Sequence, residues 1–204
     1  ASTHLEHDYR ARGYHHIAGL DEAGRGAWAG PLVVGAVILP IQRPDLSDIL
    51  RGVRDSKTVT TLNQRQRLAD KVRDVAIAWG VGLVQPAEID THGLTHATHL
   101  AMHRALQHLR DGFSSIAPDL LFLDHIALPD TLLPQISRPR MDSLSLTVAA
   151  ASLIAKSHRD DIMIGLDELY PQYDFAHNKG YAATAGADTH RKALAEHGPS
   201  QIGR

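Results

Sequence analysis

The stretch Gly19–Pro31, GLDEAGRGAWAGP, joins two apolar runs of the chain. The first run, His16–Leu20, overlaps the start of the stretch, and the second, Leu32–Leu39, follows it. The glycines of the stretch favour a tight turn, because glycine adopts positive φ without steric cost. Two apolar runs separated by such a turn predict a pair of strands. Asp21 and Glu22 follow the first run, so the predicted strand pair carries two carboxylates at its turn.

Further strands and helices are predicted on the C-terminal side of this pair. Ile77–Val84 and Leu120–Leu123 are two more strand candidates. Apolar residues three and four apart predict helices over Thr61–Val75 and Thr95–Leu109. Ser145–Leu169 predicts the longest helix, and its first half, SLTVAAASLIA, is so uniformly small and apolar that it should be buried on the sheet. We therefore expect an α/β fold with a mixed central β-sheet flanked by α-helices.

Length and composition fit one domain. The chain has 204 residues, of which 43% are hydrophobic and 22% charged, and no repeat or linker divides it, so we expect a single domain over residues 1–204. The absence of cysteine excludes thiol catalysis and thiolate zinc sites. A formal net charge of −2 argues against a protein that coats nucleic acid through bulk charge. Any site for a polyanion must therefore be local.

The sequence has no segment that suits a membrane. Its longest apolar stretch, Ala27–Ile41, contains two prolines and is shorter than the roughly 20 residues of a membrane helix. The N-terminal region lacks the pattern of a signal peptide. We expect a soluble, cytoplasmic protein without a membrane partner.

Adjacent carboxylates beside a glycine-rich turn are compatible with more than one kind of site. Asp21 and Glu22 could simply end a strand, and the glycines could serve only the turn. A dinucleotide fingerprint requires G-x-G-x-x-G before a helix, whereas here the third glycine comes one place late and a strand follows. A phosphate loop would need G-K-[ST], which is absent. Carboxylates beside backbone amides do suit divalent cations placed against a phosphodiester, because hard cations take oxygen ligands.

Such a metal site needs further carboxylates, and two residues have suitable positions. Asp124 ends the apolar run LLFLD, and Asp142 precedes the buried helix in RMDSLSLTVAAAS. Asp124 could instead be a turn residue, and Asp142 could be an acidic group that favours a helix N-terminus. Because strand ends and helix starts of an α/β fold commonly meet at one edge of the sheet, we expect these residues to join Asp21 and Glu22 in one site.

A series of short motifs extends over nearly the whole chain in a fixed order. They are D-E-x-G-R-G at Asp21–Gly26 with the A-G-P that follows, D-S-K at Asp55–Lys57, E-I-D at Glu88–Asp90, the strand-end Asp124, Asp142 with A-A-A-S-L-I-A-K at Ala149–Lys156, R-D at Arg159, Y-P-x-Y at Tyr170 and K-G-Y at Lys179–Tyr181. In this order the motifs resemble bacterial ribonuclease HII, the type 2 ribonuclease H family. The fold that the resemblance implies, a ribonuclease H-like mixed sheet with helices, agrees with the expected pattern.

The resemblance implies a metal-dependent endoribonuclease. Its substrates would be the RNA strand of RNA/DNA hybrids and the 5′ side of single ribonucleotides in duplex DNA, with 3′-hydroxyl and 5′-phosphate products, in ribonucleotide excision repair and RNA primer removal. Asp21, Glu22, Asp124 and Asp142 match the family's catalytic carboxylates, which hold two Mg²⁺ or Mn²⁺ ions about 3.5 to 4 Å apart. Without metal, at least one of the four should have a raised pKa, because like charges repel.

The resemblance also implies a set of substrate-binding residues. They are Gly24, Arg25, Gly26, Lys57, Lys156, Lys179 and Tyr181. The glycine turn matches the segment that contacts the ribose 2′-hydroxyl through backbone groups, and the tyrosine matches one that stacks on the sugar beside the RNA-to-DNA junction. Each lysine could equally be a solvated surface residue. We expect a helical, substrate-contacting segment from about residue 170, and a chain that acts on nucleic acid as a monomer.

Several positions depart from the family pattern. His125 stands where glycine is usual, Arg140 and Met141 replace Lys-Gly, Asn178 replaces histidine, and the segment after Tyr181 is longer. His125 could crowd the metal site or act as a nearby proton donor. One alternative is therefore a binding module that has lost catalysis. Another, a phosphatase of small substrates, lacks a D-x-D motif and would need a closed pocket.

Four of the 14 histidines form a regular series. His92, His96, His99 and His103 are spaced by four, three and four residues, which places them on one face of a helix. The apolar residues lie on the opposite face, so we expect this stripe to face solvent rather than to form a built metal site. It could bind Zn²⁺ or Ni²⁺ adventitiously, and below about pH 6.5 it would become cationic and able to touch a phosphate backbone.

Overall fold

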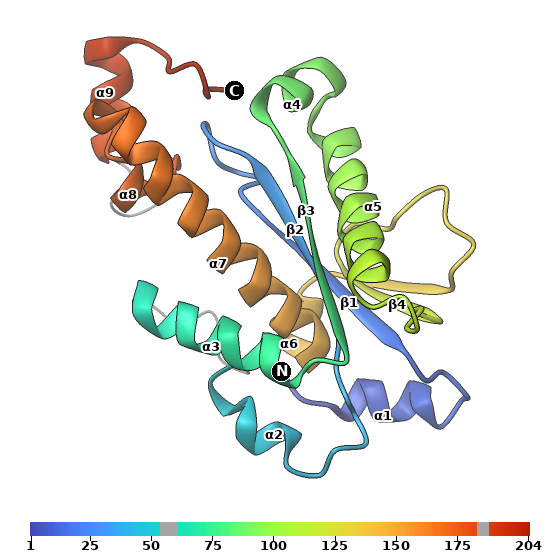
Figure 1. Cartoon of the computed structure of the whole chain (residues 1–204). Coiled ribbons are helices and arrows are strands. Elements are labelled where there is room, and N and C mark those ends of the chain that lie inside the picture. Colours follow the sequence, from blue (N-terminus) through green and yellow to red (C-terminus); the bar gives the residue numbers. More distant parts are fainter. Residues whose placement is uncertain (54–60, 183–187) are drawn as a thin grey trace.

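The structure is a computed structural model, which describes residues 1–53, 61–182 and 188–204 (Figure 1). Its elements are α1 (His4–Arg10), β1 (Ile17–Ala23), β2 (Leu32–Ile38), α2 (Leu46–Ile49), the 3-10 turn η1 (Arg51–Val53), α3 (Leu62–Val75), β3 (Ala78–Val84), α4 (Pro86–His92), α5 (Leu94–Gly112), β4 (Leu120–Asp124), β5 (Gln135–Arg138), α6 (Met141–Leu144), α7 (Leu146–Leu169), the 3-10 turn η3 (Pro171–Tyr173), α8 (Phe175–Asn178) and α9 (Asp188–His197).

The strands form one mixed sheet in the order β3-β2-β1-β4-β5. β1 pairs antiparallel with β2, and β2 pairs antiparallel with β3. β1 pairs parallel with β4, and β4 with β5. Because β1 and β4 are parallel neighbours, their carboxyl ends lie at the same edge of the sheet. The predicted α/β fold with a mixed sheet flanked by helices is confirmed.

Helices cover both faces of the sheet (Figure 1). α5 packs on β2 and β3, and α7 packs on β1 and β2 from the other side, with α3 against it. α7 approaches so closely that a methyl group at Gly19 would lie 2.6 Å from the backbone of Thr147, and one at Gly35 would lie 2.3 Å from the carbonyl oxygen of Ala151. Only glycine in the strands and small residues on the helix permit this contact. The first half of α7 is buried, as the sequence predicted.

The boundaries of several elements differ from the predicted ones. β1 continues through Ala23, so the acidic pair lies within the strand. α7 begins one residue later than expected, because the Ser145 side chain accepts a hydrogen bond from the Val148 amide and caps the helix. Thr61 caps α3 in the same way. β5 was not predicted, because its four partly or fully exposed residues show no apolar periodicity.

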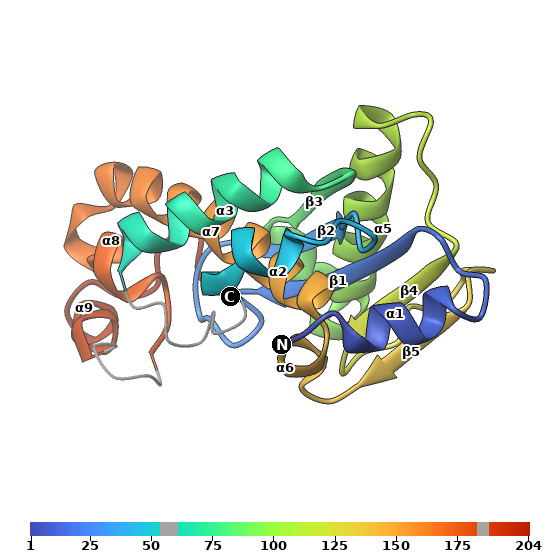
Figure 2. The same ribbon diagram turned by 90° about the horizontal axis from the view of Figure 1, so that it is seen from below.

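The chain after α7 packs against the end of that helix. Figure 2 shows α8 and α9 gathered at the end of the molecule away from α1. The Tyr173 and Phe175 rings are stacked with centroids 5.4 Å apart, and they share an apolar cluster with Ala29 and Met163. The C-terminal segment is thereby joined to the glycine-rich connection between β1 and β2. Among the described residues, no helix combines the length and apolarity needed to cross a membrane.

Candidate active site

Asp21 and Glu22 lie side by side near the end of β1, and both have perturbed pKa values. Burial raises the pKa of Asp21 to about 6, against the opposing influence of Ser152 and Lys156 on α7. Burial and the neighbouring Asp21 raise the pKa of Glu22 to about 7. Asp124 adds repulsion to both groups. These three carboxylates therefore form one electrostatic cluster at the edge where β1 and β4 end.

Asp142 is brought to the same edge through a backbone contact. The Met141 amide donates a hydrogen bond of 2.8 Å to Oδ1 of Asp124, which ties the start of α6 to the end of β4. Asp142 follows directly and is buried, with an oxygen accepting a hydrogen bond from Ser143 at 3.3 Å. The sheet edge thus gathers all four predicted carboxylates in one region, from three separate elements.

The chemistry of this donor set fits a divalent cation. Its atoms are carboxylate oxygens, which hard cations such as Mg²⁺ and Mn²⁺ prefer. Oε2 of Glu22 is buried and accepts no hydrogen bond from the described part of the chain, so it lacks the partner that a buried anion normally has. Within residues 1–53, 61–182 and 188–204, no three histidine or acidic side chains are arranged to hold one ion as they stand. Side-chain rotation would have to bring the carboxylates together around an ion.

The turn after β1 is held in a conformation that requires glycine. Gly24 has φ +89°, and a methyl group there would lie 2.1 Å from Nε of Arg159. Its amide donates to the Tyr181 hydroxyl at 3.1 Å, and its carbonyl oxygen accepts from Nη1 of Arg204 at 2.6 Å. Gly26, by contrast, is exposed: apart from its two chain neighbours, no atom of the described residues lies within 4 Å of a methyl group built on it. The structure therefore places Tyr181 against the turn and leaves the tip of the turn free for a ligand.

Arg159 joins this turn to the segment that carries Tyr181. It is only 2% exposed and donates hydrogen bonds to three carbonyl oxygens. The acceptors are Pro31 at 2.9 Å, Ala29 at 3.0 Å and Lys179 at 2.9 Å. The Arg159 guanidinium also lies over the Tyr181 ring, 5.2 Å from its centroid. One buried side chain thus holds both the turn after β1 and the segment that carries Tyr181.

Arg204 holds the other side of the turn. Besides binding Gly24, it donates to the Gly30 carbonyl at 2.8 Å from Nε, and its backbone amide donates to the Trp28 carbonyl at 2.9 Å. Burial lowers its pKa to about 10, so it stays charged at neutral pH. Neither arginine was among the residues predicted to bind metal or substrate. The R-D motif at Arg159 was a signal for one of them, whereas nothing local marks Arg204.

The basic residues expected to bind substrate are placed differently from one another. Lys156 lies on α7 near Asp21 and donates to Ser152 at 2.8 Å. Arg25 lies 4.0 Å from Glu22, between Nη1 and Oε1. Lys179 donates to the Ala176 carbonyl, and the charge that acts on it most is Asp160, so its amine is not brought to the carboxylates. Burial lowers the pKa of Lys179. Lys57 lies outside the described residues.

The departures from the family pattern have structural consequences. His125 and Arg140 both adopt left-handed backbone, with φ +64° and +60°, and the His125 side chain is exposed. Met141 is fully buried. Asn178 is also buried and accepts a hydrogen bond from the Gly180 amide at 2.8 Å, so it shapes the backbone just before Tyr181. Most of the longer segment after Tyr181, residues 183–187, lies outside the described part of the chain.

The predicted single helical stripe of histidines was wrong in one respect. His92 ends α4, and Gly93, with φ +79°, separates it from α5, which carries His96, His99 and His103. The spacing alone did not reveal this break, because it continues from α4 into α5. The rings of His92 and His96 are neighbours, with centroids 5.2 Å apart.

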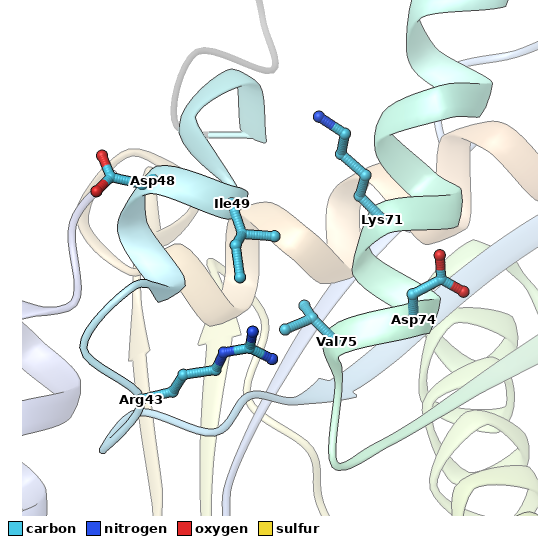
Figure 3. Close-up of a pocket in the computed structure, with 6 residues that line it drawn as sticks. All are labelled: Arg43, Asp48, Ile49, Lys71, Asp74 and Val75. Atoms are coloured by element: carbon cyan, nitrogen blue, oxygen red, sulfur yellow. The ribbon is translucent and has the colours of Figure 1, made fainter.

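A hollow of about 410 Å³ between α2 and α3 lies apart from this region (Figure 3). Its lining residues are Arg43, Asp48, Ile49, Lys71, Asp74 and Val75. Val75 ends α3, and β3 begins shortly afterwards at Ala78. Ala78 pairs with Ile38, and Ile38 pairs with Ala18 near the start of β1. The hollow is therefore at the opposite edge of the sheet from the carboxylates, and its charges are mixed.

The chain is similar to known proteins in both sequence and fold. A family model described as Ribonuclease HII matches residues 18–204. The chain is 49% identical over 188 residues to the ribonuclease HII of Thermus thermophilus, which covers 92% of this chain and 84% of that relative. The ribonuclease H2 structure from Pyrococcus horikoshii is similar with a TM-score of 0.72 and 28% identity, covering 93% of this chain and 92% of that one. Bst-RNase HIII in complex with Mn²⁺ shares the fold, with a TM-score of 0.66 and 21% identity over 89% of this chain and 70% of its own.

Proposed function

Since the chain belongs to the ribonuclease HII family and is a metal-dependent endoribonuclease acting on RNA/DNA hybrids, we propose that it also cuts on the 5′ side of single ribonucleotides embedded in duplex DNA. Its place would be in ribonucleotide excision repair and in the removal of RNA primers. The observation that best supports this proposal is the fixed position of Gly24, next to the acidic pair of β1. Its amide is bonded to Tyr181 and its carbonyl oxygen to Arg204. Recognition of the 2′-hydroxyl next to the cleaved bond requires such a fixed backbone, because that hydroxyl distinguishes RNA from DNA.

The four carboxylates would hold the catalytic metal. When bound, two Mg²⁺ or Mn²⁺ ions supply an activated water and stabilise the leaving oxygen of an in-line displacement. Hydrolysis would break the bond between phosphorus and the 3′-oxygen, and the water would supply the new oxygen of the 5′-phosphate and the proton of the 3′-hydroxyl. The raised pKa values of Asp21 and Glu22 support this assignment, since burying two adjacent acids without a cation is unfavourable. The Mn²⁺ named with Bst-RNase HIII is a further support for a divalent cation.

The chain's own residues would bind and orient the substrate. The open tip at Gly26 admits the ribose closely, and Tyr181, held against Gly24, supports the neighbouring sugar. Lys156 lies where it can approach a phosphate oxygen beside Asp21. We further propose one catalytic domain over residues 1–204, with the segment from about residue 170 contacting the duplex, acting as a monomer in the cytoplasm.

A cleavage assay tests this function. The substrates are a labelled DNA duplex with one embedded ribonucleotide and a continuous RNA/DNA hybrid, each with Mg²⁺, with Mn²⁺ and with EDTA. We expect metal-dependent cleavage of both, with the cut on the 5′ side of the single ribonucleotide. Cleavage of the hybrid alone would refute the single-ribonucleotide activity, and binding without any cleavage would favour a binding module.

The assignment of the carboxylates is tested by Asp21→Asn. We expect its cleavage rate to fall more than about a hundredfold, because the change removes a metal ligand's charge. The matched control is Asp8→Asn on the exposed surface of α1, which should cleave like the unmodified chain. Retained turnover by Asp21→Asn would show that this carboxylate is not essential.

A further inference from the structure

The solvent side of α5 carries an unusual concentration of imidazoles. His96 and His103 are exposed and His99 is half-buried, whereas the opposite side of the helix packs on β2 and β3. His92, at the end of α4, continues the series through its ring contact with His96. We call these four residues the histidine face. Exposed imidazoles at this density have no packing role, so their surface is available to a ligand.

The histidine face lies beside the candidate active site. Val84, which ends β3, pairs with Leu32, and Val33 pairs with Ala23 at the end of β1, so α4 and the start of α5 lie at the carboxylate edge of the sheet. Figure 1 shows α4 at the same end of the molecule as the connection between β1 and β2. His99 is also within electrostatic reach of Arg25, which lies beside Glu22. The face therefore extends the site along α5.

The charges around the histidine face permit it to become cationic. From α4, Glu88 is neutralised by Arg104 of α5 at 2.7 Å, which leaves the exposed Asp90. The segment after β4 contributes Asp130 and the exposed His125, and the glycine turn contributes Arg25 with its partner Glu22. Along α5 itself, the further charged groups are Arg110 and Asp111.

Protonation of the imidazoles depends on pH in a range close to neutrality. Burial, followed by the neighbouring His96 and His103, lowers the pKa of His99. A falling pH favours the protonated form of an imidazole, for which an ordinary pKa is about 6.5. Because its pKa is lowered, His99 gains its charge at a lower pH than an ordinary histidine does. Both forms of imidazole carry an N–H that can donate to a phosphate oxygen, but only the protonated form adds a charge.

We propose that the histidine face binds the phosphate backbone of the duplex that the active site cuts, and that this contact strengthens as the pH falls. The inference rests on the proposed function, because it assigns a second contact region to the same substrate. A nucleic-acid backbone suits the face better than a metal ion, since in the described residues no three acidic or histidine groups are placed to share an ion. A backbone also suits its elongated shape over α4 and two turns of α5. Most contacts of nucleic-acid proteins are of this kind, to phosphate.

The test measures binding of a labelled RNA/DNA hybrid in EDTA, where the substrate stays intact, at about pH 6 and about pH 8 over a range of salt concentrations. The test variant combines His96→Gln, His99→Gln and His103→Gln, which retain a donor but cannot become charged. The matched control combines His4→Gln, His7→Gln and His15→Gln, three exposed histidines near the opposite edge of the sheet. Both variants lose the same number of histidines.

At about pH 6, we expect the unmodified chain and the control to bind the hybrid about tenfold more tightly than the test variant. Their affinity should also fall more steeply with increasing salt concentration. At the higher pH the three proteins should differ much less. Equal affinity and equal salt dependence of the test variant and the control at about pH 6 would overturn the inference. Cleavage of a DNA duplex with one embedded ribonucleotide by the unmodified chain, with Mn²⁺ at about pH 8, is measured in parallel. Its absence would instead refute the proposed function.

Discussion

Gly24 and Gly26 belong to one turn, but a methyl group would meet very different surroundings at each. At Gly24 it would collide with Arg159 and would also require φ +89°. At Gly26 it would meet no atom of the described part of the chain beyond its two chain neighbours. The first glycine is therefore needed by the protein itself, whereas the second is needed only if something else approaches the turn.

Alanine at each position separates these two needs. Gly24→Ala should lower the free energy of unfolding by about 2 kcal/mol or more, since strained backbone and a clash combine. Gly26→Ala should leave thermal stability unchanged but reduce cleavage at a single ribonucleotide by at least about tenfold, because its methyl group keeps the ribose from the turn. Thermal denaturation and the cleavage assay measure the two effects. Full activity of Gly26→Ala would show that the substrate does not approach this backbone.

Among the secondary-structure elements, the two arginines connect parts of the chain that are remote in sequence. Arg159 comes from the middle of α7, and Arg204 lies beyond α9, yet both bind the carbonyl oxygens of the connection between β1 and β2. Their hydrogen bonds set where the turn lies relative to Tyr181. We therefore regard both as positioning residues.

Arg204→Lys tests this positioning role. A lysine keeps the charge but cannot donate to Gly24 and Gly30 from one planar group, so the turn should lose its fixed place. We expect kcat on a single ribonucleotide to fall about tenfold or more with a smaller change in KM, because small misplacements act on the chemical step. Arg51→Lys, at a side chain that is 80% exposed, is the matched control. If activity on every substrate fell equally, and only as much as the amount of folded protein, Arg204 would have a purely structural role.

The same elements show what the sequence could predict. The central strands and long helices were predicted within a few residues, because apolar periodicity and capping residues such as Ser145 act locally. The break at Gly93 was missed, because spacing of 4 and 3 continues across it. The place of Arg204 was also unpredictable, since its partners are backbone carbonyls 174 and 180 residues away. The local sequence pattern indicates which carboxylates lie near strand ends. The contacts that position the connection between β1 and β2 exist only after folding.

For the molecule as a whole, the buried acids link the stability of the fold to pH and to metal. The pKa values of Asp21 and Glu22 rise to about 6 and about 7 on folding. A carboxyl with a raised pKa binds its proton more tightly in the folded chain than in the unfolded chain. Its stabilising contribution to the free energy of unfolding is therefore fully present below the unfolded pKa near 4, and it is lost as the pH rises through the folded pKa. Without metal, the fold should therefore lose stability between about pH 4 and pH 7 at these two positions, by about 3 kcal/mol for Asp21.

Asp21→Asn removes one of these two titrating groups. Although the substitution should abolish activity, we expect it to stabilise the fold. In EDTA near pH 8, we expect the variant to be more stable than the unmodified chain, because it no longer buries that charge. Mn²⁺ should then stabilise the unmodified chain by binding only its folded form, and should stabilise the variant much less. Denaturant unfolding between about pH 5 and pH 8, with EDTA and with Mn²⁺, measures both effects. If the unmodified chain and the variant lost stability in parallel as pH rose, and gained equally from Mn²⁺, Asp21 would be neither a strained acid nor a metal ligand.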